Sequence, residues 1–130
     1  MFKIFGGKPK VFITDERHLE NMESQMRMLP QTLNQLREYG IDDSKSLKLE
    51  FFFYTNTSDK AAALSEKLFE NGYESAFEVS ASNKKLFIVT GLTTPIQMTA
   101  DRVIEWAGKM CVLGHRQDCE FDGWGTNPDQ

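Results

Sequence analysis

The chain has 130 residues, of which 40% are hydrophobic, and its formal net charge is −4. This length and composition predict one folded domain over residues 1–130, and the acidic balance disfavours direct nucleic-acid binding. The sequence has no run of about 20 apolar residues for a membrane helix, and two cysteines are too few for a disulfide-rich secreted protein. We therefore expect a cytoplasmic protein with reduced thiols and no membrane partner.

Residues 1–46 are predicted to be a lead-in followed by an N-terminal helix. Thr14 or Asp15 can cap the start of this helix, and Gly40 can end it. Apolar residues recur every three or four positions and form one stripe: Leu19, Met22, Met26, Leu29, Leu33 and Leu36. Pro30 lacks an amide hydrogen and clashes with the preceding turn, so the segment is either one kinked helix or two helices.

Residues 47–126 alternate between strand and helix patterns. The predicted strands are residues 47–54, 73–79, 85–90 and 117–122, and the predicted helices are residues 60–71 and 95–113. Gly72 and Gly114 are expected to end the two helices, and Pro95 suits a first helical turn. The order βαββαβ predicts an α+β fold with a ferredoxin-like core, an antiparallel sheet of strand order 4-1-3-2.

The two inner strands of this sheet are apolar on both faces, whereas the outer strands carry acids. Glu74 and Glu78 lie on the second predicted strand, and Glu120 and Asp122 on the fourth, where charge protects a sheet edge. The helices cover one face, and three aromatic residues are predicted to form a patch on the other: Phe52, Tyr54 and Phe87. Since an aromatic side chain buries about 150–250 Å², we expect a cover for this patch, either the N-terminal stripe, a partner protein or a second copy.

Two cysteines and a histidine are the strongest candidates for chemistry. Cys111, His115 and Cys119 are spaced four residues apart, and thiolate and imidazole groups bind zinc or act as nucleophiles. A CxxC pair and a fourth ligand are both missing, so we predict core cysteines, no metal, no cofactor and no catalytic residue. His18 lies among charged residues and is expected to be solvated. Aromatics on inner strands also occur in RNA-binding domains, but the acidic neighbours disfavour that function here.

The end of the chain combines aromatic, acidic and glycine residues next to the fourth predicted strand. We predict that these residues bind a partner: Glu120, Phe121, Asp122, Gly123, Trp124, Gly125 and Thr126. A tryptophan beside carboxylates suits a basic, arginine-containing segment. The plainer interpretation is that the glycines allow Trp124 to pack back onto the fold.

Three segments resemble the ribonuclease E inhibitor B (RraB) family of bacterial regulators. They are LKLEFFFYTNT at residues 47–57, TGLTTP at 90–95 and, most specifically, CEFDGWGT at 119–126. The resemblance implies a ferredoxin-like α+β fold and a non-catalytic activity, in which the protein binds the endoribonuclease away from its active site and modulates RNA decay. It implies no catalytic residue.

The sequence therefore predicts a regulatory protein-binding module whose partner is ribonuclease E or a similar basic protein. Two alternatives from other classes stay open. One is a small-ligand- or metal-dependent enzyme that uses Cys111, His115 and Cys119. The other is a structural module that self-associates, as a homodimer, through the leucine and methionine stripe or through the sheet.

Overall fold

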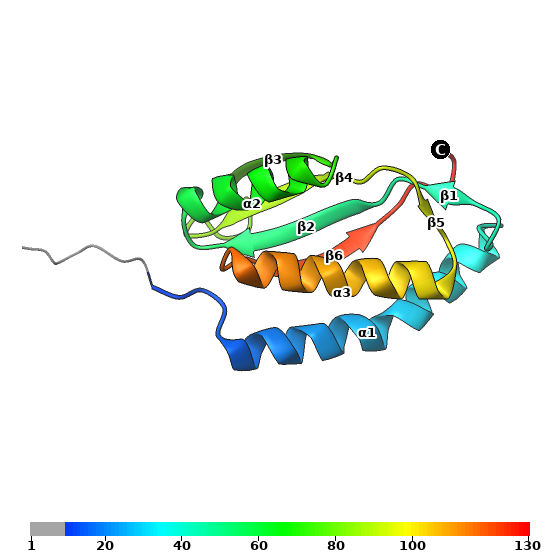
Figure 1. Ribbon diagram of the computed structural model, residues 1–130, viewed down its shortest axis with the longest axis horizontal. Helices are drawn as coiled ribbons and strands as arrows, with labels where there is room; N and C mark the ends of the chain where they lie inside the picture. The colour runs from blue at the N-terminus through cyan, green and yellow to red at the C-terminus, as the bar shows by residue number, and fades with distance from the viewer. Residues whose placement is uncertain (1–9) are drawn as a thin grey trace, which may run out of the picture.

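The computed structural model describes residues 10–130, so the first nine residues of the predicted lead-in lie outside it. Within these residues the chain forms three α-helices and six β-strands (Figure 1). In chain order they are α1 (Asp15–Glu38), β1 (Ser46–Leu47), β2 (Glu50–Thr55), α2 (Ser58–Glu70), β3 (Glu74–Val79), β4 (Phe87–Leu92), β5 (Ile96–Gln97), α3 (Ala100–Arg116) and β6 (Glu120–Gly125). The predicted α+β class is confirmed.

The strands form two antiparallel sheets. The larger sheet has the order β3-β4-β2-β6, so β2 and β4 lie inside and β3 and β6 form the edges. The smaller sheet pairs β1 with β5. The first predicted strand is thus divided into β1 and β2, because residues 48 and 49 between them belong to neither strand.

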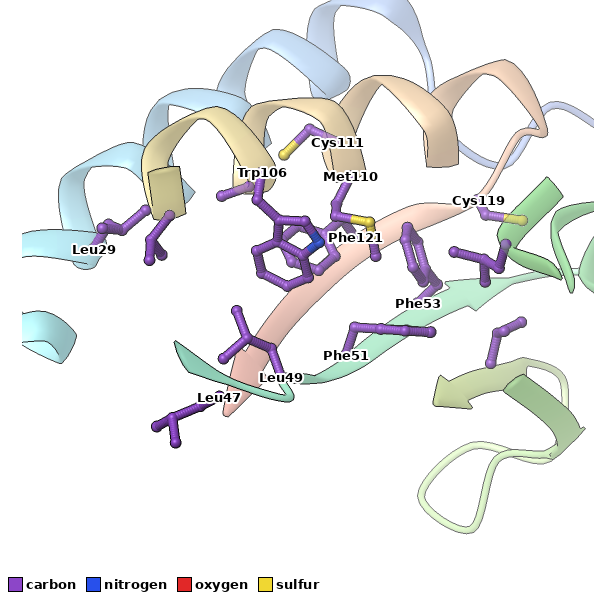
Figure 2. Close-up of a cluster of buried hydrophobic side chains, with 14 of the residues drawn as sticks. Leu29, Leu47, Leu49, Phe51, Phe53, Trp106, Met110, Cys111, Cys119 and Phe121 are labelled. Carbon is purple, nitrogen blue, oxygen red and sulfur yellow. The ribbon is translucent and has the colours of Figure 1, made fainter. Parts of the chain in front are cut away.

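Helices α2 and α3 cover one face of the larger sheet. Figure 1 shows α2 in front of β3 and β4, and α3 in front of β6. Figure 2 shows Phe51, Phe53 and Phe121 of the sheet within the core. These side chains and Val89 of β4 are each 0% or 1% exposed. Gly91 of β4 lies opposite Phe51 in the register, where an added Cβ would collide with the Phe51 ring and the Glu74 carbonyl oxygen.

Helix α1 is continuous through Pro30, which decides between the two predicted forms of this segment. The Thr14 side chain caps its start, and Gly40, with φ +85°, follows its end. Figure 1 shows α1 alongside α3, on the side away from α2. The expectation that the apolar stripe could cover the second sheet face is therefore wrong, because Leu29, Leu33 and Leu36 join the core on the helix side.

Two boundaries of α3 differ from the prediction. The helix begins at Ala100 after the Thr99 cap, because residues 96 and 97 pair with β1 instead of forming a first turn at Pro95. Gly114 does not end the helix. It lies inside it, where an added Cβ would approach the Phe53 ring and the Cys119 carbonyl oxygen to 2.8 Å. None of the helices in residues 10–130 combines the length and apolarity needed to span a membrane.

Candidate protein-binding surface

The predicted partner-binding residues 120–126, here called the β6 motif, belong mostly to an edge strand. Phe121 is 1% exposed, and its ring centroid lies 5.2 Å from that of Phe53 and 5.9 Å from that of Trp106. Trp124 is half-buried and meets Trp106 edge to face, with 6.1 Å between ring centroids. Both aromatic residues of the motif therefore pack into or onto the core, as the plainer interpretation predicted for Trp124.

A bulge in β6 explains the glycine and the acid of the motif. The register with β2 shifts between Phe52 and Phe53, so Asp122 is an extra residue and Gly123 adopts φ +148°. Asp122 is exposed to solvent, yet partial burial of its carboxyl raises its pKa, and the nearby Glu120 raises it further. Asp122 is thus the motif's most accessible charged group.

The last residue of the motif anchors the C-terminal tail. Thr126 Oγ1 donates a hydrogen bond to the Lys48 carbonyl oxygen at 2.8 Å. Gln130 Nε2 donates to the same oxygen at 3.0 Å, and the Lys48 amide donates to Gln130 Oε1 at 2.6 Å. Lys48 lies in the gap between β1 and β2, so the tail supplies partners to backbone groups there that the sheets leave unpaired.

Helix α1 closes the outer edge of β6. Asn21 Nδ2 donates to the Phe121 carbonyl oxygen at 2.9 Å, and Gln25 Nε2 lies 3.3 Å from that of Asp122. Arg17 forms a two-point ion pair with Glu120, with N–O distances of 2.6 and 2.9 Å. The acids predicted at this edge are present, but Glu120 is paired with Arg17, and side chains of α1 also hydrogen-bond the edge.

The face of the larger sheet opposite α2 and α3, here called the open sheet face, has an apolar centre. Its side chains alternate with those of the core. They are Phe52 and Tyr54 on β2 and Ile88, Thr90 and Leu92 on β4. The first four are partly exposed, Leu92 is 40% exposed, and no element of residues 10–130 packs over them.

The predicted patch is correct for Phe52 and Tyr54 but wrong for Phe87. The antiparallel register pairs Phe87 with the fully buried Thr55, so Phe87 lies on the helix side and packs against the core. Ile88 takes its place opposite Tyr54. Alternation within each strand is visible in the sequence, but the register between two strands is not, and one step of register reverses the faces.

Three exposed carboxylates border the open sheet face. Glu50 and Glu74 flank Leu92 in the register, and Glu78 lies opposite Ile88. None of these glutamates forms an ion pair with any residue from 10 to 130. A hollow of about 610 Å³ lies at the Glu50 end, between Phe52, Leu92 and the C-terminal tail. The surface therefore combines partly exposed aromatic side chains with negative charge that no described residue neutralises.

Comparison with known families identifies the chain. The family described as Regulator of ribonuclease activity B (RraB) matches residues 27–126, which include the second half of α1 and all six strands. The chain belongs to the RraB family. No curated protein matches it. The family assignment supports a regulatory role, and the resemblance predicted from three short segments is confirmed.

In this RraB-family chain the two cysteines lie in the core. Cys111 and Cys119 are each almost fully buried, and burial raises their pKa values to about 11 and about 12. The thiolate form that a nucleophile or a zinc ligand requires is therefore disfavoured. Within residues 10–130, three or more histidine, cysteine and acidic side chains do not come together anywhere as a metal site.

The histidines form a pair that the sequence did not reveal. His18 is not simply solvated as predicted: its ring stacks on that of His115, with centroids 4.2 Å apart and planes 4° from parallel. His115 Nε2 lies 2.9 Å from Asp15 Oδ1, while the Nδ1 atoms of both histidines are buried without a hydrogen-bond partner. Burial lowers the pKa of His18, His115 lowers it further, and Asp15 partly opposes them. The pair joins α1 to α3.

Proposed function

We propose that this protein is a non-catalytic regulator that binds a basic segment of a ribonuclease through the open sheet face. The observation that carries the proposal is the arrangement of unpaired glutamates around the partly exposed Phe52 and Tyr54. Membership in the RraB family supports a ribonuclease as the regulated enzyme. Ribonuclease E, or a similar protein with basic segments, is the proposed partner.

The chemistry of the surface favours arginine and lysine. The guanidinium group of arginine stacks on aromatic faces and pairs with carboxylates, so Tyr54, Phe52 and the bordering glutamates suit one basic segment. Negative charge also attracts a positive partner over long distances and raises the association rate. The exposed Asp122 of the β6 motif adds a further carboxylate beside β2, whereas Glu120, opposite Tyr54, is already paired with Arg17. Phe121 and Trp124 of the motif support the strand from the core.

We also propose that the larger sheet with α2 and α3 is a ferredoxin-like unit. The strand order β3-β4-β2-β6 and the chain order β2-α2-β3-β4-α3-β6 support this assignment. A core shared by residues from Leu29 to Phe121 supports one domain. This unit thus presents the open sheet face on rigid strands, which keeps the entropic cost of ordering the surface on binding low.

The direct test measures binding to immobilised ribonuclease E together with the rate of RNA cleavage. Glu50→Lys with Glu78→Lys should weaken binding by at least about tenfold and reduce modulation of cleavage by the same factor. Glu66→Lys with Glu105→Lys is the matched control, because both glutamates are exposed on helices and the net-charge change is identical. Equal weakening by the two double variants would mean that overall charge, and not this surface, determines binding.

A further inference from the structure

The two edges of the larger sheet differ in what pairs with them. Side chains of α1 hydrogen-bond the carbonyl groups on the outer side of β6. The strand at the other edge, β3, pairs with β4 alone. An edge strand with unpaired backbone groups is a template for adding another strand.

The phase of the β3–β4 ladder identifies the outward-facing backbone groups. The Ser80 amide donates to the Leu86 carbonyl oxygen at 2.8 Å. In an antiparallel ladder, the backbone N–H and C=O groups of Ser80 and of every second residue before it therefore point toward β4. Ser75, Phe77 and Val79 therefore point their N–H and C=O groups outward. Within residues 10–130 these groups take part in none of the hydrogen bonds outside the sheet ladders, and they present an array of alternating donors and acceptors.

The side chains beside this edge differ on its two faces. Glu74 and Glu78 are exposed on the open sheet face and have no ion-pair partner among the described residues. On the helix side Phe77 is 38% exposed, Val79 is 50% exposed and Phe69 of α2 is 79% exposed. A shallow hollow of about 490 Å³ lies between Phe69 and the start of β3. An added strand would meet acids on one face and apolar groups on the other.

We propose that the free edge of β3 accepts an extended segment of the partner as a fifth strand of the sheet. This inference rests on the proposed function and specifies how the basic segment binds. Its residues alternate between lysine or arginine, which face Glu74 and Glu78, and apolar residues, which contact Phe77, Val79 and Phe69. Backbone hydrogen bonds provide the affinity, and the alternation provides the specificity.

Charge complementarity selects this occupant over a second copy of the chain. An antiparallel copy of β3 centred on Ala76 sets Glu74 opposite Glu78, and like charges directly opposite are destabilising. A copy centred on Phe77 still gathers four glutamates on one face. A basic strand neutralises the same glutamates, so the negative charge that opposes self-pairing favours the partner.

The test uses a blocked heptapeptide of alternating lysine and valine as the probe, with alternating glutamate and valine as its control. Binding of the lysine peptide should slow hydrogen exchange of the Ser75, Phe77 and Val79 amides at least about tenfold relative to the free protein. The glutamate peptide should leave these amides unchanged. Unchanged exchange at all three amides with the lysine peptide bound would overturn strand addition.

A pair of variants separates the contribution of a backbone N–H group from that of the side chain. Val79→Pro removes one outward N–H and is compatible with an edge strand, while Val79→Ala shortens the side chain and keeps that N–H. Strand addition predicts that the proline variant binds the lysine peptide at least about tenfold more weakly than the alanine variant. Equal affinities would contradict it. Circular dichroism of both variants confirms that they fold, and the exchange measurement on the unmodified protein is independent of them.

The outcomes also separate this inference from the proposed function. If ribonuclease E binding depends on Glu50 and Glu78 but Val79→Pro has no effect, the basic segment binds the open sheet face without adding a strand. If no basic peptide or ribonuclease E segment binds, the proposed function fails as well. A sedimentation dimer that the proline variant abolishes would assign the edge to a second copy and overturn the choice of occupant.

Discussion

At the scale of single residues, Asp118 organises the junction between α3 and β6. It adopts φ 56° and accepts hydrogen bonds from the amides of Phe12 at 2.8 Å and Ile13 at 2.9 Å. Its carboxylate also pairs with Lys60 of α2 at 2.5 Å. One side chain thus connects the lead-in, α2 and the start of β6, and it holds the buried Ile13 in place.

Replacing Asp118 should destabilise the protein in a pH-dependent way. Burial raises the pKa of its carboxyl, but hydrogen bonds from Ile13, Lys60 and Phe12 outweigh burial and hold the pKa below its usual value. Its contribution is therefore present above about pH 4 and is lost as the pH falls through the lower pKa of the folded state. We expect Asp118→Asn to lower the free energy of unfolding by about 2 kcal/mol at pH 7 in urea denaturation.

The control for this prediction is Asp129→Asn, which makes the same chemical change at an exposed residue. The difference between Asp118→Asn and the unmodified protein should shrink as the pH falls below 4. A difference that does not change from pH 7 to pH 3 would show that the charge of Asp118 does not stabilise the junction.

At the scale of elements, α1 lies along the outer edge of β6, where the sheet has no further strand. Gln25 is 6% exposed, and its amide lies 3.4 Å and 3.3 Å from the carbonyl oxygens of Phe121 and Asp122. A buried carbonyl without a partner is unfavourable. We expect Gln25→Ala to lower the free energy of unfolding by about 1–2 kcal/mol, measured by urea denaturation.

Gln35→Ala supplies the matched control, because Gln35 lies on the same helix and is exposed. It should change the stability by less than about 0.5 kcal/mol. Equal effects of the two substitutions would mean that α1 contributes through its length and not through its contact with β6.

The stacked histidines make the packing of α1 on α3 sensitive to mild acid. Because burial and His115 lower the pKa of His18, the unfolded chain binds this proton more tightly than the folded chain. The stability that His18 contributes is therefore present above about pH 6.5 and declines as the pH falls toward its lower folded-state pKa. We expect His18→Asn to lose less stability than the unmodified protein between pH 7.5 and pH 5.5, measured by urea denaturation at each pH. Parallel losses in both proteins would contradict this role.

At the scale of the whole molecule, the sequence predicted the order of elements better than their contacts. Glycine stops and strand alternation located α2, β3 and the start of β2 within a few residues. Alternation alone predicts the wrong face for Phe87, because the register between strands is a property of the assembled sheet. The stripe predicted a buried helix face correctly from Met22 to Leu36 but wrongly for Leu19, which is 65% exposed. Nothing in its spacing shows that α3 and β6 are its neighbours.

The candidate site was predictable in its chemistry and less so in its position. Acidic and aromatic residues near the chain end suggested a basic partner, and the DGWG sequence pointed to β6. The fold uses Phe121, Trp124 and Thr126 to hold the core and the tail. The accessible acids and aromatics lie instead on β2, β3 and β4, and they become one surface only through strand pairing.

The most direct test of the account is an NMR titration of the labelled protein with the most basic segment of ribonuclease E at low salt. Binding through the open sheet face should concentrate the chemical-shift changes on Phe52, Tyr54, Ile88 and the β3 residues beside them, and these changes should disappear as the salt concentration rises. Changes confined to α1 and α3, or the absence of any change at millimolar peptide, would contradict binding through the open sheet face.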